Sequence, residues 1–220
     1  MKYRVRENFL RIQEEIAPCK SKIIAVTKYF DKNAIIDAYH AGLRDFAESR
    51  VIEATEKING LPNEIKQNSK FHFIGHLQTN KVKKVLETFD LIHSVDSLKL
   101  AEKISEQAKE AGKIQEILLE INNANEPQKY GFSKSEIFEC FSKIMQLNNI
   151  KVIGLMNMAP LGANQEELHN IFSELAEIKD KLNESNNCEL KELSMGMSQD
   201  YKIAAKEGST MLRIGRKLFE

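Results

Sequence analysis

Lys28 is the residue whose position most clearly suggests chemistry, because it follows closely on the apolar run Ile-Ile-Ala-Val at residues 23–26. Such a run is typical of a buried strand, and we predict a strand over residues 23–28. Parallel α/β folds keep their chemistry at the carboxyl ends of their strands. Burial or a neighbouring cation lowers the pKa of a lysine amine, and the neutral amine can then form a Schiff base with an aldehyde. A lysine alone in this position is more often a solvated loop residue.

Two glycine-containing motifs near the end of the sequence indicate a phosphate site. They are Ser194-Met195-Gly196-Met197-Ser198 and Arg213-Ile214-Gly215, and Gly208-Ser209-Thr210 precedes the second. A glycine beside a serine at a helix start lets backbone N–H groups and a hydroxyl converge on an anion. Helix capping and chain turning are the structural alternatives, and capping uses the same N–H groups. A Schiff-base lysine and a site for one phosphate together indicate pyridoxal 5'-phosphate (PLP), although a Schiff-base aldolase acting on a sugar phosphate uses the same two features.

Arg213 needs a partner if it lies inside the fold. If Ile214 packs outward, Arg213 points inward, where an unpaired guanidinium is costly. The ring nitrogen or phosphate of a cofactor can serve as that partner. A carboxylate such as Glu48 or Asp96 can serve equally well, and the spacing does not decide between them.

The segment Phe-His-Phe-Ile-Gly-His-Leu-Gln-Thr-Asn-Lys at residues 71–81 runs from a predicted third strand into its loop. His72, between two phenylalanines, is expected to be a hydrogen-bonded wall residue rather than a general base. Gly75 is expected to let the backbone turn close to the site. Gln78 and Asn80 are candidate loop anchors or helix caps, and His76 is expected to be solvated.

The elements that position these residues alternate between strand-like runs and amphipathic helical stretches, which indicates parallel βαβ units. Eight such units in 220 residues predict a single-domain α/β fold, a (β/α)8 TIM barrel over residues 1–220. An open doubly wound sheet is the alternative, but no glycine-rich turn follows the first strand. Residues before Ser21 are expected to form an extra helix packed on the barrel. The predicted strands are 23–28, 44–47, 71–74, 91–95, 116–122, 151–156, 190–195 and 211–214, with helices that include 33–41, 98–108, 137–147 and 167–182.

The composition excludes several classes of function. Hydrophobic residues make up 42% of the chain and charged residues 29%, which is ordinary for a globular protein, and the formal net charge is zero. We therefore expect no nucleic-acid partner. The charged amino terminus is neither a signal peptide nor a membrane span, so we expect a cytoplasmic protein. The three cysteines and five histidines show no ligand spacing, so we expect no metal.

Taken together, these motifs resemble those of the pyridoxal phosphate homeostasis protein family. Residues 71–81 are similar to the family signature, 25–28 to its cofactor-lysine strand, and 193–198 and 208–215 to its phosphate-binding end. Residues 154–156 and 129–132 fit as well. The resemblance implies a barrel like the N-terminal domain of alanine racemase (fold type III), with PLP on Lys28. It implies a cofactor site formed by Lys28, Ser49, His72, Gly75, Asn122, Met156, Ser194, Gly196, Met197, Ser198, Thr210, Arg213, Ile214 and Gly215.

Within that site, the resemblance assigns the phosphate to Ser198, Thr210 and Gly215, and it places Arg213 near the pyridine nitrogen. The sequence departs from the family at Ser49, where an asparagine that could bond the cofactor is usual. His76 also stands where a proline is common. The polar loop over residues 122–130, with Pro127, is a lid or a plain surface loop.

The family is regarded as a group of PLP carriers or buffers without an established catalytic activity. We expect no second domain over the site, because the sequence ends just after the eighth strand. A racemase, the enzymatic alternative, needs acid/base groups on both faces of its substrate. Tyr29 and Tyr130 are the tyrosines in loops that can reach the site. We expect a monomer whose partners are PLP and PLP-dependent apoenzymes that receive the cofactor.

Overall fold

Eight parallel strands form a closed barrel in the computed structural model, which describes residues 4–124, 126 and 129–220. Each strand pairs with the next along the chain, and the last strand pairs with the first. The predicted (β/α)8 barrel is confirmed, and the doubly wound alternative is wrong. The strands are β1 (Lys22–Val26), β2 (Asp45–Glu48), β3 (Lys70–Phe73), β4 (Leu91–Val95), β5 (Gln115–Glu120), β6 (Ile150–Met156), β7 (Glu192–Met197) and β8 (Met211–Ile214).

Buried apolar side chains form one core between the barrel wall and the helices and a second core inside the barrel. Along β8, Leu212 and Ile214 belong to the outer core, whereas Met211 belongs to the inner one. Because both faces of the strands are buried, the strands appear in the sequence as nearly continuous apolar runs. Ile214 packs outward, which is the condition considered from the sequence, and Arg213 points inward. The inner core contains Ile24, Val26, Ala47, Leu91, Leu118, Met156 and Met211.

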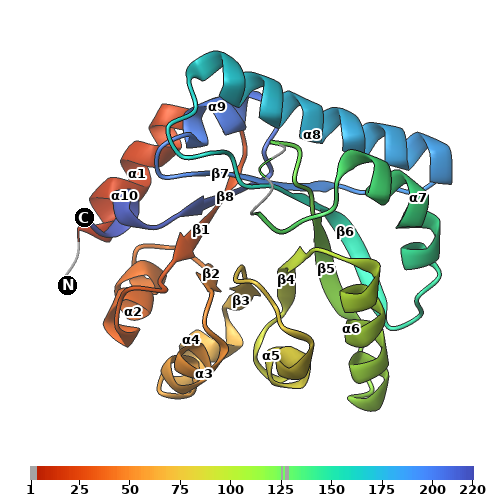
Figure 1. The fold of residues 1–220 in the computed structure, drawn as a ribbon. Coiled ribbons are helices and arrows are strands. Elements are labelled where there is room, and N and C mark those ends of the chain that lie inside the picture. The colour runs from red at the N-terminus through yellow and green to blue at the C-terminus, as the bar shows by residue number, and fades with distance from the viewer. Residues whose placement is uncertain (1–3, 125, 127–128) are drawn as a thin grey trace.

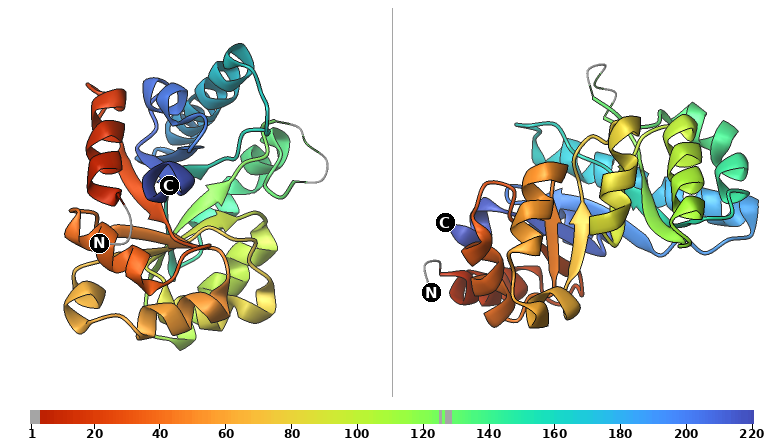
Figure 2. Two further views of the ribbon diagram at one scale, coloured as in Figure 1. Left: turned by 90° about the vertical axis from the view of Figure 1, so that its left-hand side faces the viewer. Right: turned by 90° about the horizontal axis from the view of Figure 1, so that it is seen from below.

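The helices lie outside the strands and connect them (Figures 1 and 2). Polar residues begin several of them, and Ser133 and Asn164 each form a reciprocal capping box with a glutamate three residues later. These helices are α2 (Lys32–His40), α3 (Val51–Asn59), α4 (Asn63–Gln67), the 3-10 helix η1 (Thr79–Lys81), α5 (Val82–Thr88), α6 (Leu98–Glu110), α7 (Lys134–Met145), α8 (Gln165–Asn186), α9 (Tyr201–Lys206) and α10 (Arg216–Phe219).

The predicted N-terminal helix is confirmed as α1 (Val5–Ile16), which lies beside α10 at one side of the barrel (Figure 1). The Asn8 side-chain amide donates a hydrogen bond of 3.1 Å to the Leu218 carbonyl oxygen. The Tyr201 hydroxyl of α9 donates one to the Glu15 carboxylate. Since Val5, Ile12 and Ile16 are also buried, both polar and apolar contacts fix α1 to the end of the chain.

The strand bounds differ from the predicted ones mainly where functional residues follow a strand. Strand β1 ends at Val26, so Lys28 lies in the loop just beyond the strand rather than at its last position. Strand β7 begins at Glu192 and continues to Met197, two residues later than predicted at each end. In the described part of the chain, no helix has the length and apolar character needed to cross a membrane.

Candidate functional site

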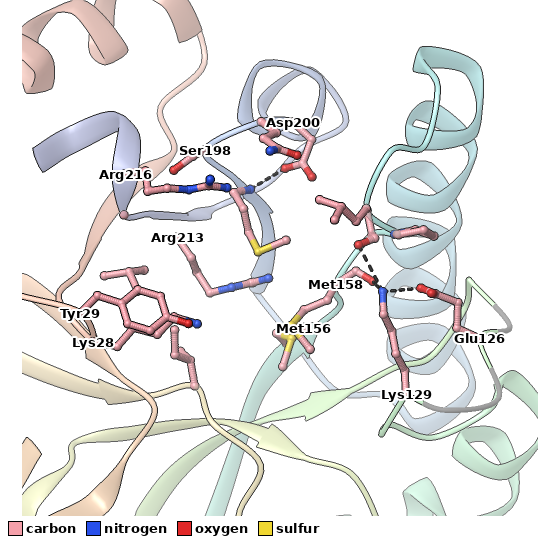
Figure 3. A pocket seen from close by; sticks show the side chains of 18 of the residues that line it. Lys28, Tyr29, Glu126, Lys129, Met156, Met158, Ser198, Asp200, Arg213 and Arg216 are labelled. Atoms are coloured by element: carbon pink, nitrogen blue, oxygen red, sulfur yellow. Dashed lines mark hydrogen bonds and ion pairs between the residues drawn. The ribbon is translucent and has the colours of Figure 1, made fainter. Parts of the chain in front are cut away.

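A pocket of about 650 Å³ lies at the carboxyl ends of the strands (Figure 3). Its volume is in the range of small-molecule sites. Six residues predicted from the sequence lie in its wall, namely Lys28, Met156, Met197, Ser198, Arg213 and Gly215. The rest of the wall consists of Val26, Tyr29, Phe30, Ile74, Glu126, Lys129, Met158, Ala159, Pro160, Leu161, Gln199, Asp200 and Arg216.

Lys28 is half-buried and is carried by a firmly held stretch of backbone. The Thr27 hydroxyl donates a hydrogen bond of 2.7 Å to the buried Glu48 carboxylate. The Lys57 ammonium donates to the Thr27 carbonyl oxygen at 2.8 Å and to Glu48 at 2.6 Å. The Lys28 ammonium lies 5.1 Å from the centre of the Tyr29 ring. The residue before Lys28 is thus fixed through both its hydroxyl and its carbonyl, which places the amine at the pocket.

The loops after β7 and β8 meet at the wall that carries Ser198, Gly215 and Arg216. The Lys217 backbone N–H donates a hydrogen bond of 3.4 Å to the Ser198 hydroxyl oxygen, which joins the two loops. A hydroxyl, a guanidinium and an accessible glycine backbone in one wall are suitable groups for binding a phosphate. The two phosphate motifs predicted from the sequence are therefore brought together at this wall, through Ser198 and Gly215.

Arg213 is 4% exposed and is held by three hydrogen bonds. Its Nη1 donates to the Ser194 carbonyl oxygen at 2.6 Å and to the Ser194 hydroxyl at 2.7 Å, and its Nη2 donates to the Asn157 carbonyl oxygen at 2.8 Å. A guanidinium has five N–H donors, so two remain for a ligand. Burial lowers the pKa of Arg213 to about 10, against the opposing charges of Asp200 and Glu120. The side chain is therefore a cation at neutral pH.

The two carboxylates considered from the sequence have other partners and do not neutralise Arg213. Glu48 forms its ion pair with Lys57 at 2.6 Å. Asp96 Oδ2 lies 3.3 Å from His76 Nδ1. Arg213 is instead bound by carbonyl and hydroxyl oxygens, which leaves its positive charge available to the pocket.

The pocket wall carries more positive than negative side chains. Lys129 forms an ion pair with Glu126 and also donates a hydrogen bond of 3.3 Å to the Ala159 carbonyl oxygen (Figure 3). The excess positive charge favours an anionic ligand. The four cations are Lys28, Lys129, Arg213 and Arg216, and the two carboxylates are Glu126 and Asp200.

Gly75 and Gly196, both predicted as site residues, serve packing rather than the pocket wall. A Cβ at Gly75 would lie 2.2 Å from the Ser49 carbonyl oxygen, so the loops after β2 and β3 are in backbone contact. Ser49 does not line the pocket either. Gly196 has φ +91°, and a Cβ there would lie 2.5 Å from the Ala204 Cβ. These glycines allow close approach of the segments that carry the site.

Thr210 lies at the opposite end of its strand from the pocket, contrary to the prediction that it binds the phosphate. It precedes β8, and its hydroxyl donates to the Glu192 carboxylate at 2.5 Å and accepts from the Leu193 N–H at 2.9 Å. In a barrel of parallel strands, a motif before a strand lies at the amino-terminal face. Ile214 also does not line the pocket, since its side chain lies in the outer core.

Asn122 organises the loop beside the pocket without lining the pocket itself. Its side-chain amide donates to the carbonyl oxygens of Glu126 at 2.9 Å and Lys129 at 3.2 Å. Glu126 and Lys129 reach the wall, so this loop borders the site. Pro127, which the lid prediction includes, lies outside the described residues. Tyr130 stacks on His76 with ring centres 3.6 Å apart and is not part of the pocket wall.

His72 is a buried, hydrogen-bonded wall residue of the barrel, as expected from its flanking phenylalanines, but it does not line the pocket as the cofactor-site prediction required. Its Nε2 lies 3.0 Å from Asp45 Oδ1, and its Nδ1 lies 2.9 Å from His93 Nε2. His93 Nδ1 lies 2.9 Å from the hydroxyl of Ser194, which in turn binds Arg213. Ser194 therefore binds Arg213 from the interior of the barrel and does not line the pocket. Sequence reasoning missed Asp45 and His93, although both lie on short strands whose alternate residues face inward.

The sequence also gave little indication of several wall residues. The loop after β6 contributes Met158, Ala159, Pro160 and Leu161, and the loop after β1 contributes Tyr29 and Phe30. The feature of the sequence that could have identified these residues is their position directly after predicted strands. Within the described residues, no group of three His, Cys, Asp or Glu side chains could hold a metal ion.

The sequence is similar to known proteins over nearly its whole length. The family model of the alanine racemase N-terminal domain matches residues 3–219. A pyridoxal phosphate homeostasis protein of Synechocystis sp. is 42% identical over 202 residues, which cover 92% of this chain and 92% of that protein. This chain belongs to the pyridoxal phosphate homeostasis protein family. Another member, from Aquifex aeolicus, is 37% identical over 199 residues, which cover 90% of this chain and 86% of that protein.

Solved structures show the same relationship. PipY of Synechococcus elongatus, in the structure with PLP bound, matches with a TM-score of 0.89 and 34% identity, covering 99% of this chain and 100% of that one. Alanine racemase of Clostridium difficile matches with a TM-score of 0.76 and 17% identity, over 97% of this chain and 55% of the racemase chain. The match to the racemase shows a shared fold alone.

Proposed function

We propose that this protein binds PLP through a Schiff base on Lys28 and acts in PLP homeostasis as a carrier or buffer. The observation that carries the proposal is the convergence of Lys28 with Ser198, Gly215 and Arg213 in one pocket. PLP needs an amine for its aldehyde, a site for its phosphate and a partner for its ring nitrogen, and this pocket offers all three. The PLP-bound structure of PipY, a relative of 34% identity, supports the same assignment.

In this proposal Ser198, the Gly215 backbone and Arg216 hold the phosphate. The two remaining N–H groups of Arg213 would bind the ring nitrogen, and the apolar side chain of Met156 in the pocket wall would contact the ring. PLP bound in this way supplies an aldehyde that exchanges between Lys28 and other amines. The residues of the chain hold and orient the group, and they keep the ring nitrogen in contact with a permanent cation.

The arrangement of acid/base groups favours a carrier over a racemase. Two-base racemisation requires groups on opposite faces of the substrate. Tyr29 is the tyrosine in the described pocket wall, but it neighbours Lys28 on the same loop and lies on the same side of the pocket (Figure 3). It is also 76% exposed, so solvent competes for its hydroxyl. This geometry supports cofactor holding without robust turnover.

The proposal extends to partners and location. We expect a monomeric, single-domain protein over residues 1–220 that passes PLP to PLP-dependent apoenzymes. The three cysteines are free thiols, which suits the reducing cytoplasm. Transfer is measured by incubating the loaded protein with a PLP-free aminotransferase and following recovery of its activity. Light scattering measures the mass, and a dimer would contradict the monomer.

Absorbance spectroscopy tests the central claim. Purified protein mixed with PLP is expected to show the visible band of a Schiff base, and Lys28→Ala is expected to lack it. Lys20→Ala, which removes an exposed lysine shortly before β1, is the matched control and should keep the band. Borohydride reduction followed by mass spectrometry should place the cofactor on Lys28.

The outcomes separate the candidate functions. A band in both proteins would disprove attachment to Lys28, and a band in neither would return a sugar-phosphate aldolase to consideration. Borohydride trapping of a sugar phosphate at Lys28 would support that aldolase. Turnover of an amino acid that disappears in Lys28→Ala would show an enzyme instead of a carrier.

A further inference from the structure

A continuous series of polar side chains crosses the interior of the barrel from Arg213 to Asp45. Arg213 Nη1 lies 2.7 Å from Ser194 Oγ, and Ser194 Oγ lies 2.9 Å from His93 Nδ1. His93 Nε2 lies 2.9 Å from His72 Nδ1, and His72 Nε2 lies 3.0 Å from Asp45 Oδ1. The five residues come from β8, β7, β4, β3 and β2, and each is at most 9% exposed. We call this series the interior relay.

The charges at the two ends of the relay differ in sign. Lys22 Nζ lies 3.2 Å from Asp45 Oδ1. Burial raises the pKa of Asp45, but the hydrogen bond from His72 and the charges of His72 and Lys22 outweigh it and lower that pKa overall. Burial is the main reason that the pKa of His93 lies well below its usual value, with the charges of His72 and Arg213 adding to the effect. Asp45 is thus an anion and His93 is neutral.

The anionic Asp45 and the neutral His93 set the direction of every hydrogen bond in the form of the relay in which the His72 ring carries one hydrogen. The Asp45 carboxylate only accepts, so His72 Nε2 must carry the hydrogen and His72 Nδ1 must accept. His93 Nε2–H then donates to His72, and His93 Nδ1 accepts from the Ser194 hydroxyl. The Ser194 oxygen in turn accepts from Arg213, which only donates. Every bond therefore points from Arg213 toward Asp45.

We propose that Ser194, His93, His72 and Asp45 are positioning residues that act through Arg213 and hold its free N–H groups toward the ligand in the pocket. The inference rests on the proposed function for its cofactor, but the relay itself concerns only residues of this chain. A guanidinium bound solely by the carbonyls of Ser194 and Asn157 could tilt about them. The hydroxyl of Ser194 adds a third bond, and the relay orients that hydroxyl by giving its hydrogen one acceptor, His93 Nδ1.

The charged groups that act on the relay are Lys22 and Asp45 at one end, and Arg213, Glu120 and Asp200 at the other.

Histidine nitrogen NMR on the protein without PLP tests the relay directly. In ¹⁵N-labelled wild-type protein at pH 7.5, His93 is expected as the single neutral Nε2–H tautomer. Spectra of His72→Gln and His93→Gln assign the signals of the two histidines. Ser194→Ala removes the donor to His93 Nδ1, so the His93 Nδ1 signal should shift to that of a nitrogen that accepts no hydrogen bond, while the hydrogen stays on Nε2. An Nδ1–H tautomer of His93 in the wild type would overturn the proposal.

Ser209→Ala is the matched control, because it removes a buried hydroxyl that bonds the carbonyl oxygens of Leu193, Met195 and Met211 and does not hydrogen-bond a side chain of the relay. It should keep the wild-type histidine signals. The PLP dissociation constant should rise about tenfold in Ser194→Ala and stay within about twofold of wild type in Ser209→Ala, since a lost bond to a charged group is worth about one order of magnitude.

The PLP-affinity measurement and the histidine NMR test different claims, so either can give a negative result without the other. Equal losses of PLP affinity in Ser194→Ala and Ser209→Ala, or an unchanged affinity in Ser194→Ala, would overturn the action of the relay on the pocket. A wild-type protein that does not bind PLP would overturn the proposed function. The histidine spectra, recorded without PLP, test the hydrogen-bond directions in the relay whether or not the protein binds PLP.

Discussion

Glu120 is expected to make the stability of this protein fall as the pH rises from 4.5 to 7. It is the last residue of β5 and is 4% exposed. Burial, and to a lesser degree the charge of Asp96, raise its pKa from 4.5 to about 7, although Arg213 and Lys129 oppose the change. The folded protein therefore holds this proton more tightly than the unfolded chain does.

The sign and size of the effect follow from that difference. The stability that Glu120 contributes is complete below pH 4.5, where the group is neutral in both states. It is lost as the pH rises through about 7, where the folded state must ionise a buried carboxyl. The difference between the two pKa values corresponds to about 3 kcal/mol. Glu120→Gln keeps the size of the side chain and removes the ionisation, so it should stabilise the protein by up to about 3 kcal/mol at pH 8.

Urea unfolding of wild type and Glu120→Gln at pH 5 and pH 8 measures this effect. The gain should be under about 1 kcal/mol at pH 5 and several times larger at pH 8. Glu116→Gln is the matched control, because it makes the same change on the same strand at a side chain that is 37% exposed and paired with Lys151. That control should not reproduce the gain. Identical pH dependence in wild type and Glu120→Gln would refute the reasoning.

Two further substitutions test how the site is built. Arg213→Met should destabilise the protein without PLP by about 3 kcal/mol in urea unfolding, because three buried oxygen acceptors lose their donor; an unchanged midpoint would show that these bonds do not hold the site. Gly75→Ala should cost about 2 kcal/mol because its Cβ would lie 2.2 Å from the Ser49 carbonyl oxygen. Gly60→Ala, where the nearest atom is 3.5 Å away, should change the stability by less than about 0.5 kcal/mol, and equal losses would argue against a close contact at Gly75.

Much of the barrel was predictable because its strands are short apolar runs separated by amphipathic segments. The bounds of β4 and β8 agree with the sequence prediction to the residue. The inward direction of Arg213 followed from the outward packing of Ile214, since alternate strand residues face opposite sides. Lys28 was found because it follows an apolar run, although the strand ends two residues before it.

The remaining site residues depend on contacts that spacing along the chain does not determine. Thr210 was assigned to the phosphate by family resemblance, although the correctly predicted bounds of β8 already place it before the strand and so away from the pocket. His93 and Ser194 are 101 positions apart and meet inside the barrel because β4 and β7 face each other across its interior. No local pattern connects two such residues. The close packing of Gly75 on Ser49 is likewise a contact between different loops.

The positive charge of Arg213 and its capacity only to donate hydrogen bonds connect the pocket to the proposed carrier role. A guanidinium donates and never accepts, and at a pKa of about 10 it remains charged at neutral pH. Its partner on the cofactor must then be an acceptor, so a ring nitrogen bound there carries no proton. An unprotonated ring withdraws electrons less strongly and is a weaker support for carbanion chemistry. Because Arg213 has no proton to give to the ring nitrogen, the proposed contact would both bind PLP and restrain its reactivity, as the proposed carrier role requires.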